Sequence, residues 1–172
     1  MAPLHARLEG WHRAGKFAAG FLGYAAGHAL EPSLGPAPGC AGWPLGWFAQ
    51  FERCDRIARD LVPSLLPDPS GALISPPRPH IDEAGYAAAL ARISDHIRAG
   101  DIYQVNFTFP NTVGLLGDPL SAYAALRQRA RAGYGGIVHT GDHWLLSFSP
   151  ELFFSVRGRS FAARPMKGTA VP

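Results

Sequence analysis

Prolines and glycines limit where regular helices and strands can form in this chain. The 172 residues include 16 prolines and 20 glycines, which favour turns and interrupt regular elements. They are dense from Leu30 to Trp47, which predicts a loop, and prolines recur every few residues from Pro63 to Pro79, which predicts a linker. We therefore expect three regions: residues 1–62, a Pro-rich linker at 63–80, and residues 81–172.

Two segments have the pattern of helices. The first follows Asp82, a capping residue, and ends at Gly100; its apolar residues recur at helical spacing, at Tyr86, Leu90, Ile93 and Ile97. The second begins at Asp118-Pro119, a capping residue followed by proline at the first helical position, and continues to about Ala132 before Gly133.

Several short apolar runs predict strands. Ile137–Val138 is expected to pair with Trp144–Phe148 across a Gly141-Asp142 turn. In Ile102–Phe109 polar side chains alternate with apolar ones, and the polar face lies either in solvent, the commoner case, or against a ligand. The other two runs are Phe17–Tyr24 and Trp47–Phe51. This order of elements predicts an α+β fold with antiparallel sheet.

Near the C-terminus the sequence predicts a β-hairpin. Two apolar runs, Leu152–Val156 and Phe161–Ala163, flank the polar loop Arg157–Ser160. Counted outward from the Gly158–Arg159 bond, Glu151 falls opposite Met166 or Lys167, although a slip of one residue would put them on opposite faces. A carboxyl group and an amine placed there can serve as general acid and as nucleophile or base. An exposed salt bridge is the commoner alternative.

Three motifs occur in the order typical of one enzyme family. They are Gly-Asp-Ile-Tyr-Gln-Val-Asn at 100–106, Ser-Phe-Ser-Pro-Glu-Leu-Phe at 147–153 and Arg-Pro-Met-Lys-Gly-Thr at 164–169. Together they resemble the chorismate-utilising enzymes, and among these the aminodeoxychorismate synthase component I (para-aminobenzoate synthase component I) branch. The stretch from Phe17 to Phe48 also resembles the N-terminal part of the short bacterial members.

The resemblance implies a fold and a set of site residues. The family fold is a two-layer sandwich around one active site, so this chain would form an antiparallel, β-rich part of it, truncated at its C-terminal side. Lys167 would attack the chorismate ring to give a covalent adduct that ammonia displaces, and Glu151 would be the general acid for the departing hydroxyl. Gly168 and Thr169 would line the chorismate pocket. Anthranilate synthases carry alanine at the position of Lys167, so the lysine favours the aminodeoxychorismate branch.

These roles set physical requirements. Glu151 must hold a proton, and we expect Phe148, Leu152 and Phe153 to shield it from water. Lys167 must lose a proton before it can attack, which burial or a neighbouring cation such as Arg164 promotes.

The resemblance also implies partners and limits. The intact enzyme would use Mg²⁺ and ammonia from a glutamine amidotransferase subunit, to make 4-amino-4-deoxychorismate for para-aminobenzoate and folate synthesis. The family's magnesium-binding glutamates lie beyond the position of Pro172, so we expect no metal ligand in this chain and an inactive fragment. The alternatives are anthranilate synthase component I or another chorismate-converting enzyme and, from a different class, a non-catalytic remnant or a binding subunit completed by a second polypeptide.

Composition excludes other classes of function. The net charge of +3 comes almost wholly from arginines, which are scattered and accompany no nucleic-acid recognition module. The chain has no signal-peptide profile and no apolar run of membrane-spanning length. We expect a cytoplasmic protein that binds neither nucleic acid nor membrane, with a length sufficient for a sizeable core.

Overall fold

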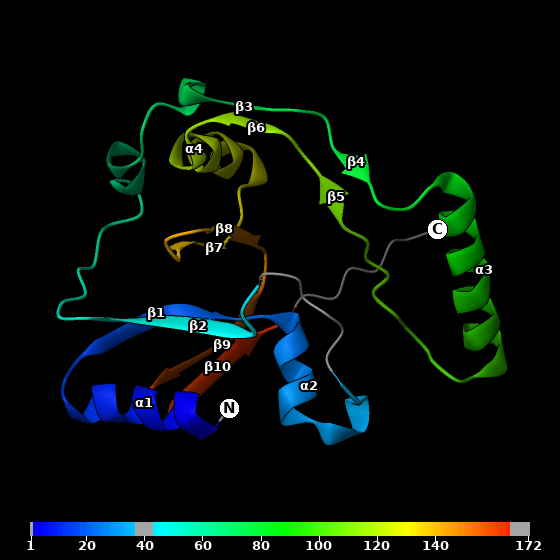
Figure 1. Ribbon diagram of the computed structural model, residues 1–172, viewed down its shortest axis with the longest axis horizontal. Coiled ribbons are helices and arrows are strands. Elements are labelled where there is room, and N and C mark those ends of the chain that lie inside the picture. The colour runs from blue at the N-terminus through cyan, green and yellow to red at the C-terminus, as the bar shows by residue number, and fades with distance from the viewer. Residues whose placement is uncertain (1, 37–42, 166–172) are drawn as a thin grey trace. The chain divides into compact units, whose positions relative to one another are not determined.

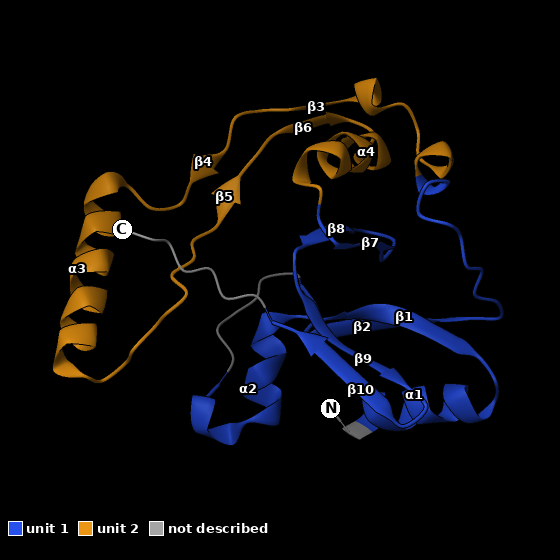
Figure 2. Ribbon diagram, turned by 180° about the vertical axis from the view of Figure 1, so that it is seen from behind, with its two compact units in different colours: residues 1–62, 132–172 blue, residues 63–131 orange. Residues whose placement is uncertain are grey.

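The computed structural model describes residues 2–36 and 43–165. It is an α+β protein in which every strand pairing is antiparallel (Figure 1), as predicted. The chain divides into two compact units: unit 1 combines residues 1–62 with 132–172, and unit 2 is residues 63–131 (Figure 2). The three regions predicted from the distribution of prolines stay a prediction.

Unit 1 contains three antiparallel strand pairs, β1 with β2, β7 with β8 and β9 with β10. The pairing of the predicted runs 137–138 and 144–148 is confirmed, since Ile137 lies opposite Leu146. The helix α1 was not predicted, and the predicted loop at 30–47 contains a short helical turn and the start of a strand. The elements are α1 (Ala2–Arg13), β1 (Phe17–Leu22), η1 (Tyr24–Ala26), α2 (Gly27–Leu30), η2 (Pro32–Leu34), β2 (Gly46–Phe51), β7 (Tyr134–His139), β8 (Trp144–Ser149), β9 (Leu152–Arg157) and β10 (Ser160–Arg164).

Unit 2 contains two helices and two short strand pairs. In β3–β6, Leu73 lies opposite Leu116, and in β4–β5, Pro79 lies opposite Asn111. Helix α4 packs on β3 and β6. The elements in this part of the chain are η3 (Val62–Leu65), η4 (Pro69–Gly71), β3 (Ala72–Ile74), β4 (Arg78–Pro79), α3 (Glu83–Ala99), β5 (Asn111–Thr112), β6 (Leu115–Gly117) and α4 (Pro119–Ala130).

Local capping explains both long helices of unit 2. The Asp82 carboxylate accepts a hydrogen bond of 2.8 Å from the Gly85 N–H at the start of α3, and Gly100 ends that helix with a left-handed backbone. Asp118 accepts from the Ser121 N–H at 2.9 Å at the start of α4. That helix ends at Ala130 and is capped by Arg131, which itself adopts a positive φ of 46°, two residues before the predicted Gly133.

The strand predicted at Ile102–Phe109 is wrong. The segment has no regular secondary structure and no strand partner among the described residues, and a strand without a partner leaves its backbone N–H and C=O groups to water. Its two phenylalanines instead pack on α3, where the ring of Tyr86 lies 5.8 Å from that of Phe107 and 5.9 Å from that of Phe109. The alternating polar residues are exposed, which fits the solvent interpretation; they are Gln104, Asn106 and Thr108.

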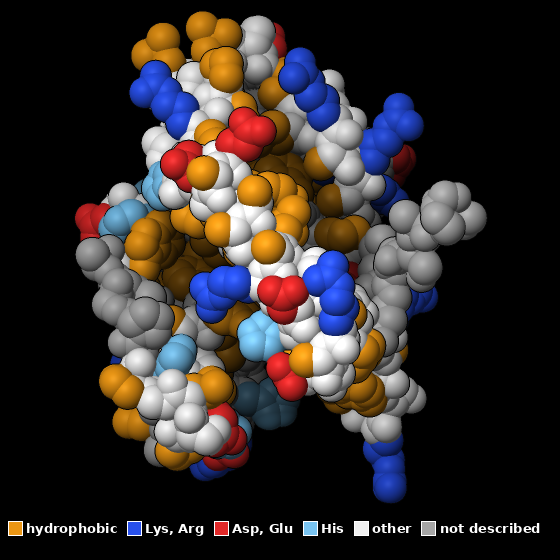
Figure 3. All heavy atoms as spheres, turned by 90° about the vertical axis from the view of Figure 1, so that its right-hand side faces the viewer, with side chains coloured by type: hydrophobic (Ala, Val, Ile, Leu, Met, Phe, Trp, Pro, Cys, Tyr) orange, Lys and Arg blue, Asp and Glu red, His pale blue; other side chains and the backbone are white. Residues whose placement is uncertain are grey.

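The buried core among the described residues is smaller than the chain length predicts. Its buried apolar residues are Ala26 in unit 1 and Ala122, Tyr123 and Ala124 in α4 of unit 2. Large apolar side chains remain open to solvent, and Figure 3 shows such side chains at the surface among charged ones. The described strands form five separate two-stranded sheets, and a sheet of two strands buries little on its own. None of the helices within 2–36 and 43–165 has the length and hydropathy needed to cross a membrane.

Candidate functional site

Glu151 lies in the short connection between β8 and β9. The hydroxyl of Ser149 accepts a hydrogen bond of 3.1 Å from the Glu151 N–H and donates one of 3.1 Å to the Glu151 carbonyl. Pro150, between them, has no N–H to offer. These two bonds fix the backbone of Glu151 at the end of β8.

The β9–β10 hairpin returns the chain toward Glu151. Its turn is Gly158-Arg159, with Arg157 opposite Ser160 and Val156 opposite Phe161. The ring of Phe154 stacks on that of Phe161, with centroids 5.9 Å apart. The hairpin predicted from the sequence is confirmed, with a turn of two residues in place of the predicted four.

A bulge in β9, where Phe153 and Phe154 face the single residue Ala163 of β10, shifts the register near the site. Between Ala162 and Arg164 the pairing changes, so that Leu152 lies opposite Arg164. A regular ladder counted from the turn would place Leu152 opposite Pro165. The observed partner of Leu152, Arg164, is one residue closer to the turn. Extending the observed register by one step puts Glu151 opposite Pro165.

Three of the predicted site residues, Lys167, Gly168 and Thr169, lie outside the described residues, as does Met166. Their roles, and the pairing of Lys167 with Glu151, stay predictions. What the described residues establish is the position of the strand that leads to them.

The predicted apolar shield around Glu151 is not formed by the described residues. Glu151 is exposed, and Phe153, expected to cover it, is itself 87% exposed. Phe148 and Leu152 are half-buried. The sequence reasoning failed because closeness in sequence does not bury a group: Leu152 points to the opposite face from its neighbours in the strand, and Phe153 is itself left open to solvent. Shielding of Glu151 therefore requires groups other than these three.

A cleft of about 290 Å³ lies beside the strand that ends at Ser149. Its lining contains glycine backbone and hydroxyl groups and no ionisable carboxylate or amine; the residues are Gly20, Phe21, Tyr134, Gly135, Gly136, Val138, Leu145, Ser147 and Ser149. Gly20 approaches the opposite strand so closely that a Cβ atom would lie 1.9 Å from the carbonyl oxygen of Trp47. Sequence reasoning missed this cleft, because β1 and β8 are more than 120 residues apart.

Among the described residues, no group of three His, Cys, Asp or Glu side chains is arranged to hold a metal ion. The described part of the chain therefore does not fit a Mg²⁺ ion.

Comparison with known proteins gives one family. The model of a family described as chorismate binding enzyme matches residues 2–171. The chain is 30% identical over 105 residues to aminodeoxychorismate synthase component 1 of Bacillus subtilis, which covers 61% of this chain and 22% of that protein. It is 38% identical over 84 residues to anthranilate synthase component 1 of Thermus thermophilus, covering 49% of this chain and 18% of that protein. It is 31% identical over 92 residues to aminodeoxychorismate synthase component 1 of Klebsiella aerogenes, covering 54% and 20%. These matches span about a fifth of each relative's length, and no solved structure matches.

Proposed function

Because this chain belongs to the family of chorismate binding enzymes, we propose that it carries the acid and the lysine of an aminodeoxychorismate synthase component. The reaction joins ammonia to chorismate and releases water, giving 4-amino-4-deoxychorismate for para-aminobenzoate and folate synthesis. The identity to the proteins of that name from Bacillus subtilis and Klebsiella aerogenes supports this proposal.

The observation that carries the proposal is the pairing of Leu152 with Arg164. It places Glu151 beside the end of β10, and only three peptide units separate Arg164 from Lys167. Three units span at most about 11 Å, since consecutive Cα atoms are 3.8 Å apart. An amine on a flexible four-carbon stem starting within that distance can reach a substrate that also contacts Glu151.

The chemistry divides between the two residues. The amine of Lys167, once deprotonated, attacks a ring carbon of chorismate while the C–O bond to the ring hydroxyl breaks. Glu151 donates its proton to that hydroxyl, which leaves as water. Ammonia then forms a C–N bond at the ring and releases the lysine. The two hydrogen bonds between the Ser149 hydroxyl and the backbone of Glu151 support this role, because they restrict the backbone that carries the acid.

A glutamine amidotransferase that delivers ammonia and a Mg²⁺ ion belong to the same proposal. Since the described residues offer no metal-binding group, no step above is assigned to the ion. Inactivity of the chain on its own stays a prediction, and turnover of chorismate with ammonium and Mg²⁺ would contradict it.

Anthranilate synthesis is the second candidate. The 38% identity to the anthranilate synthase component of Thermus thermophilus favours it. The lysine at position 167 argues against it, because the family resemblance places alanine there in anthranilate synthases. The product formed from chorismate decides between the two reactions.

A covalent adduct gives the most direct test. When the chain is completed by the rest of a family member's length and incubated with chorismate and Mg²⁺, we expect intact-protein mass spectrometry to show an added mass of chorismate less one water on Lys167. Lys167→Ala should abolish the adduct and Glu151→Gln should slow its formation by about 10²–10⁴-fold, the usual contribution of a general acid. Lys16→Ala is the matched control, because Lys16 is the other lysine of the chain and forms an ion pair with Glu52. Equal labelling of Lys16, or none at Lys167, would contradict the proposal.

A further inference from the structure

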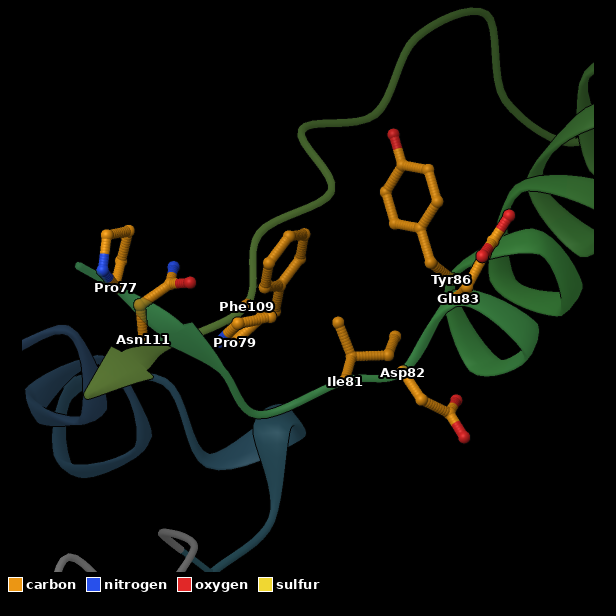
Figure 4. A pocket seen from close by; sticks show the side chains of 8 residues that line it. All are labelled: Pro77, Pro79, Ile81, Asp82, Glu83, Tyr86, Phe109 and Asn111. Carbon is orange, nitrogen blue, oxygen red and sulfur yellow. The ribbon is translucent and has the colours of Figure 1, made fainter. Parts of the chain in front are cut away.

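An open cleft in unit 2 has a distinct chemical character. It has a volume of about 460 Å³, within the range of small-molecule sites. The residues that line it come from the β4–β5 pair, the start of α3 and the segment between α3 and β5; they are Pro77, Pro79, Ile81, Asp82, Glu83, Tyr86, Phe109 and Asn111 (Figure 4). All belong to one unit, so the cleft does not depend on how the two units are placed.

Aromatic rings form the walls of this cleft. The rings of Tyr86 and Phe109 pack edge to face at 76°, with centroids 5.9 Å apart. The ring of Phe107 contacts that of Phe109, with centroids 6.1 Å apart. Ile81 lies between the two ring-bearing segments in Figure 4. Edge-to-face packing of this kind holds aromatic side chains in fixed orientations. The walls therefore favour a compact apolar body and offer ring faces to a cation.

The charges at the cleft are all negative. Along the strand, lining residues Pro77 and Pro79 alternate with Arg78 and His80, which do not line the cleft. The ring of His80 instead contacts the hydroxyl of Thr112 at 2.6 Å. Because neighbouring residues of an extended strand point to opposite faces, the side chains of Arg78 and His80 point away from the cleft. Its ionisable acids are Asp82 and Glu83, and no lysine, arginine or histidine is among its lining residues.

The positive end of the α3 dipole does not reverse this balance. A helix N-terminus attracts anions through its free N–H groups. Here Asp82 already accepts from the Gly85 N–H, and Glu83 lies in the first turn. The two carboxylates therefore neutralise the half-unit positive charge of the helix end and leave a net negative rim.

We propose that this cleft binds an organic cation with a compact apolar body, such as an aryl- or alkylammonium or guanidinium group. The apolar body lies against Pro79 and Ile81, the cationic group faces the rings of Tyr86 and Phe109, and the rim carboxylates exclude anions of the same shape. This site goes beyond the acid and lysine of the proposed reaction, which lie in unit 1 and outside the described residues.

Calorimetric titration of the full chain with two probes of equal shape tests the charge preference. Phenethylammonium should bind about five- to tenfold more tightly than phenylacetate, a difference set by the cation–π contact and the rim charges. Binding of the cation should weaken at high salt, because the rim is exposed. Equal affinity for the two probes, or tighter binding of the anion, overturns the proposal.

Three variants separate the contribution of the cleft from a general change of fold. Asp82→Asn keeps the helix cap, since Asn caps as well as Asp, and removes a charge; combined with Glu83→Gln it should cancel the preference for the cation. Tyr86→Leu keeps an apolar wall, and it should weaken the binding of phenethylammonium but not that of phenylacetate. Asp95→Asn, which removes an acid that pairs with Arg98 on the same helix, is the matched control and should bind both probes like the parent. A double rim variant that keeps the full preference, with parental circular dichroism, overturns the proposal.

Discussion

Gly158 at the turn of the β9–β10 hairpin is the position where one methyl group should disturb the approach of the chain to Glu151. Its φ is +59°, at the first central residue of a two-residue turn. A positive φ at that position is typical of a type II′ turn, which favours glycine there. We predict that Gly158→Ala opens the hairpin.

The magnitude follows from the backbone alone. A Cβ atom built on Gly158 meets nothing within 4 Å, so no steric clash adds to the cost. Placing an L-residue in the left-handed region costs about 1–2 kcal/mol. That energy corresponds to a factor of about 5–30 in the population of the closed hairpin.

Amide hydrogen exchange measured by NMR tests this value. Protection of the β9 and β10 amides should fall by about 5–30-fold in Gly158→Ala. The matched control is Gly136→Ala in β7, where a Cβ also meets nothing within 4 Å but no positive φ is required. The control should leave β7–β8 unchanged or more stable by up to about 1 kcal/mol, since alanine restricts the unfolded chain. Protection that is unchanged in Gly158→Ala, or lost equally in the control, would refute the reasoning.

Two further predictions concern capping carboxylates. Asp118→Ala removes the acceptor for both the N–H and the hydroxyl of Ser121, which is 2% exposed, so urea unfolding should show a loss of about 1–3 kcal/mol. The loss should exceed that of Asp82→Ala, whose cap is exposed, and an equal loss would contradict the role of burial. Hydrogen bonds from the Ser70 backbone and side chain hold the pKa of Asp68 below its ordinary value. Because this pKa is lowered in the folded state, the stabilisation of the turn is complete above the ordinary pKa and is lost as the pH falls through the lowered one. The amide of Ser70 should therefore titrate by NMR with a midpoint below 3.8, and a midpoint at or above that value would show that the bonds do not form.

Elements specified by neighbouring residues were predicted well from the sequence. Asp82 and Asp118 identify the starts of α3 and α4 because a cap needs only the N–H groups of the next turn. The turn at Gly158 identifies the hairpin for the same reason. In each case the interaction spans a few residues, so the sequence contains all of its components.

Features that depend on distant partners were not predicted. The run from Ile102 to Phe109 has the alternation of a strand, but alternation does not supply a partner, and Phe107 and Phe109 pack on a helix instead. The bulge in β9, where two residues face one of β10, depends on how the two strands twist, so a regular count outward from the turn does not contain it. Likewise, no motif marks the cation-binding cleft, because its lining joins segments about 30 residues apart.

The interruption of unit 1 by unit 2 has a consequence for how the protein is made. Unit 2 is one continuous stretch that ends at residue 131, whereas unit 1 also needs residues 132–172. At about 5–20 residues per second, a ribosome adds the 41 residues from 132 to 172 in roughly 2–8 s. During that interval all of unit 2 has been synthesised and can fold, whereas unit 1 still lacks the residues of β7 and β8. Apolar side chains of β1 and β2 that stay exposed even in the folded chain, such as Phe17 and Phe51, are then open to solvent throughout the delay.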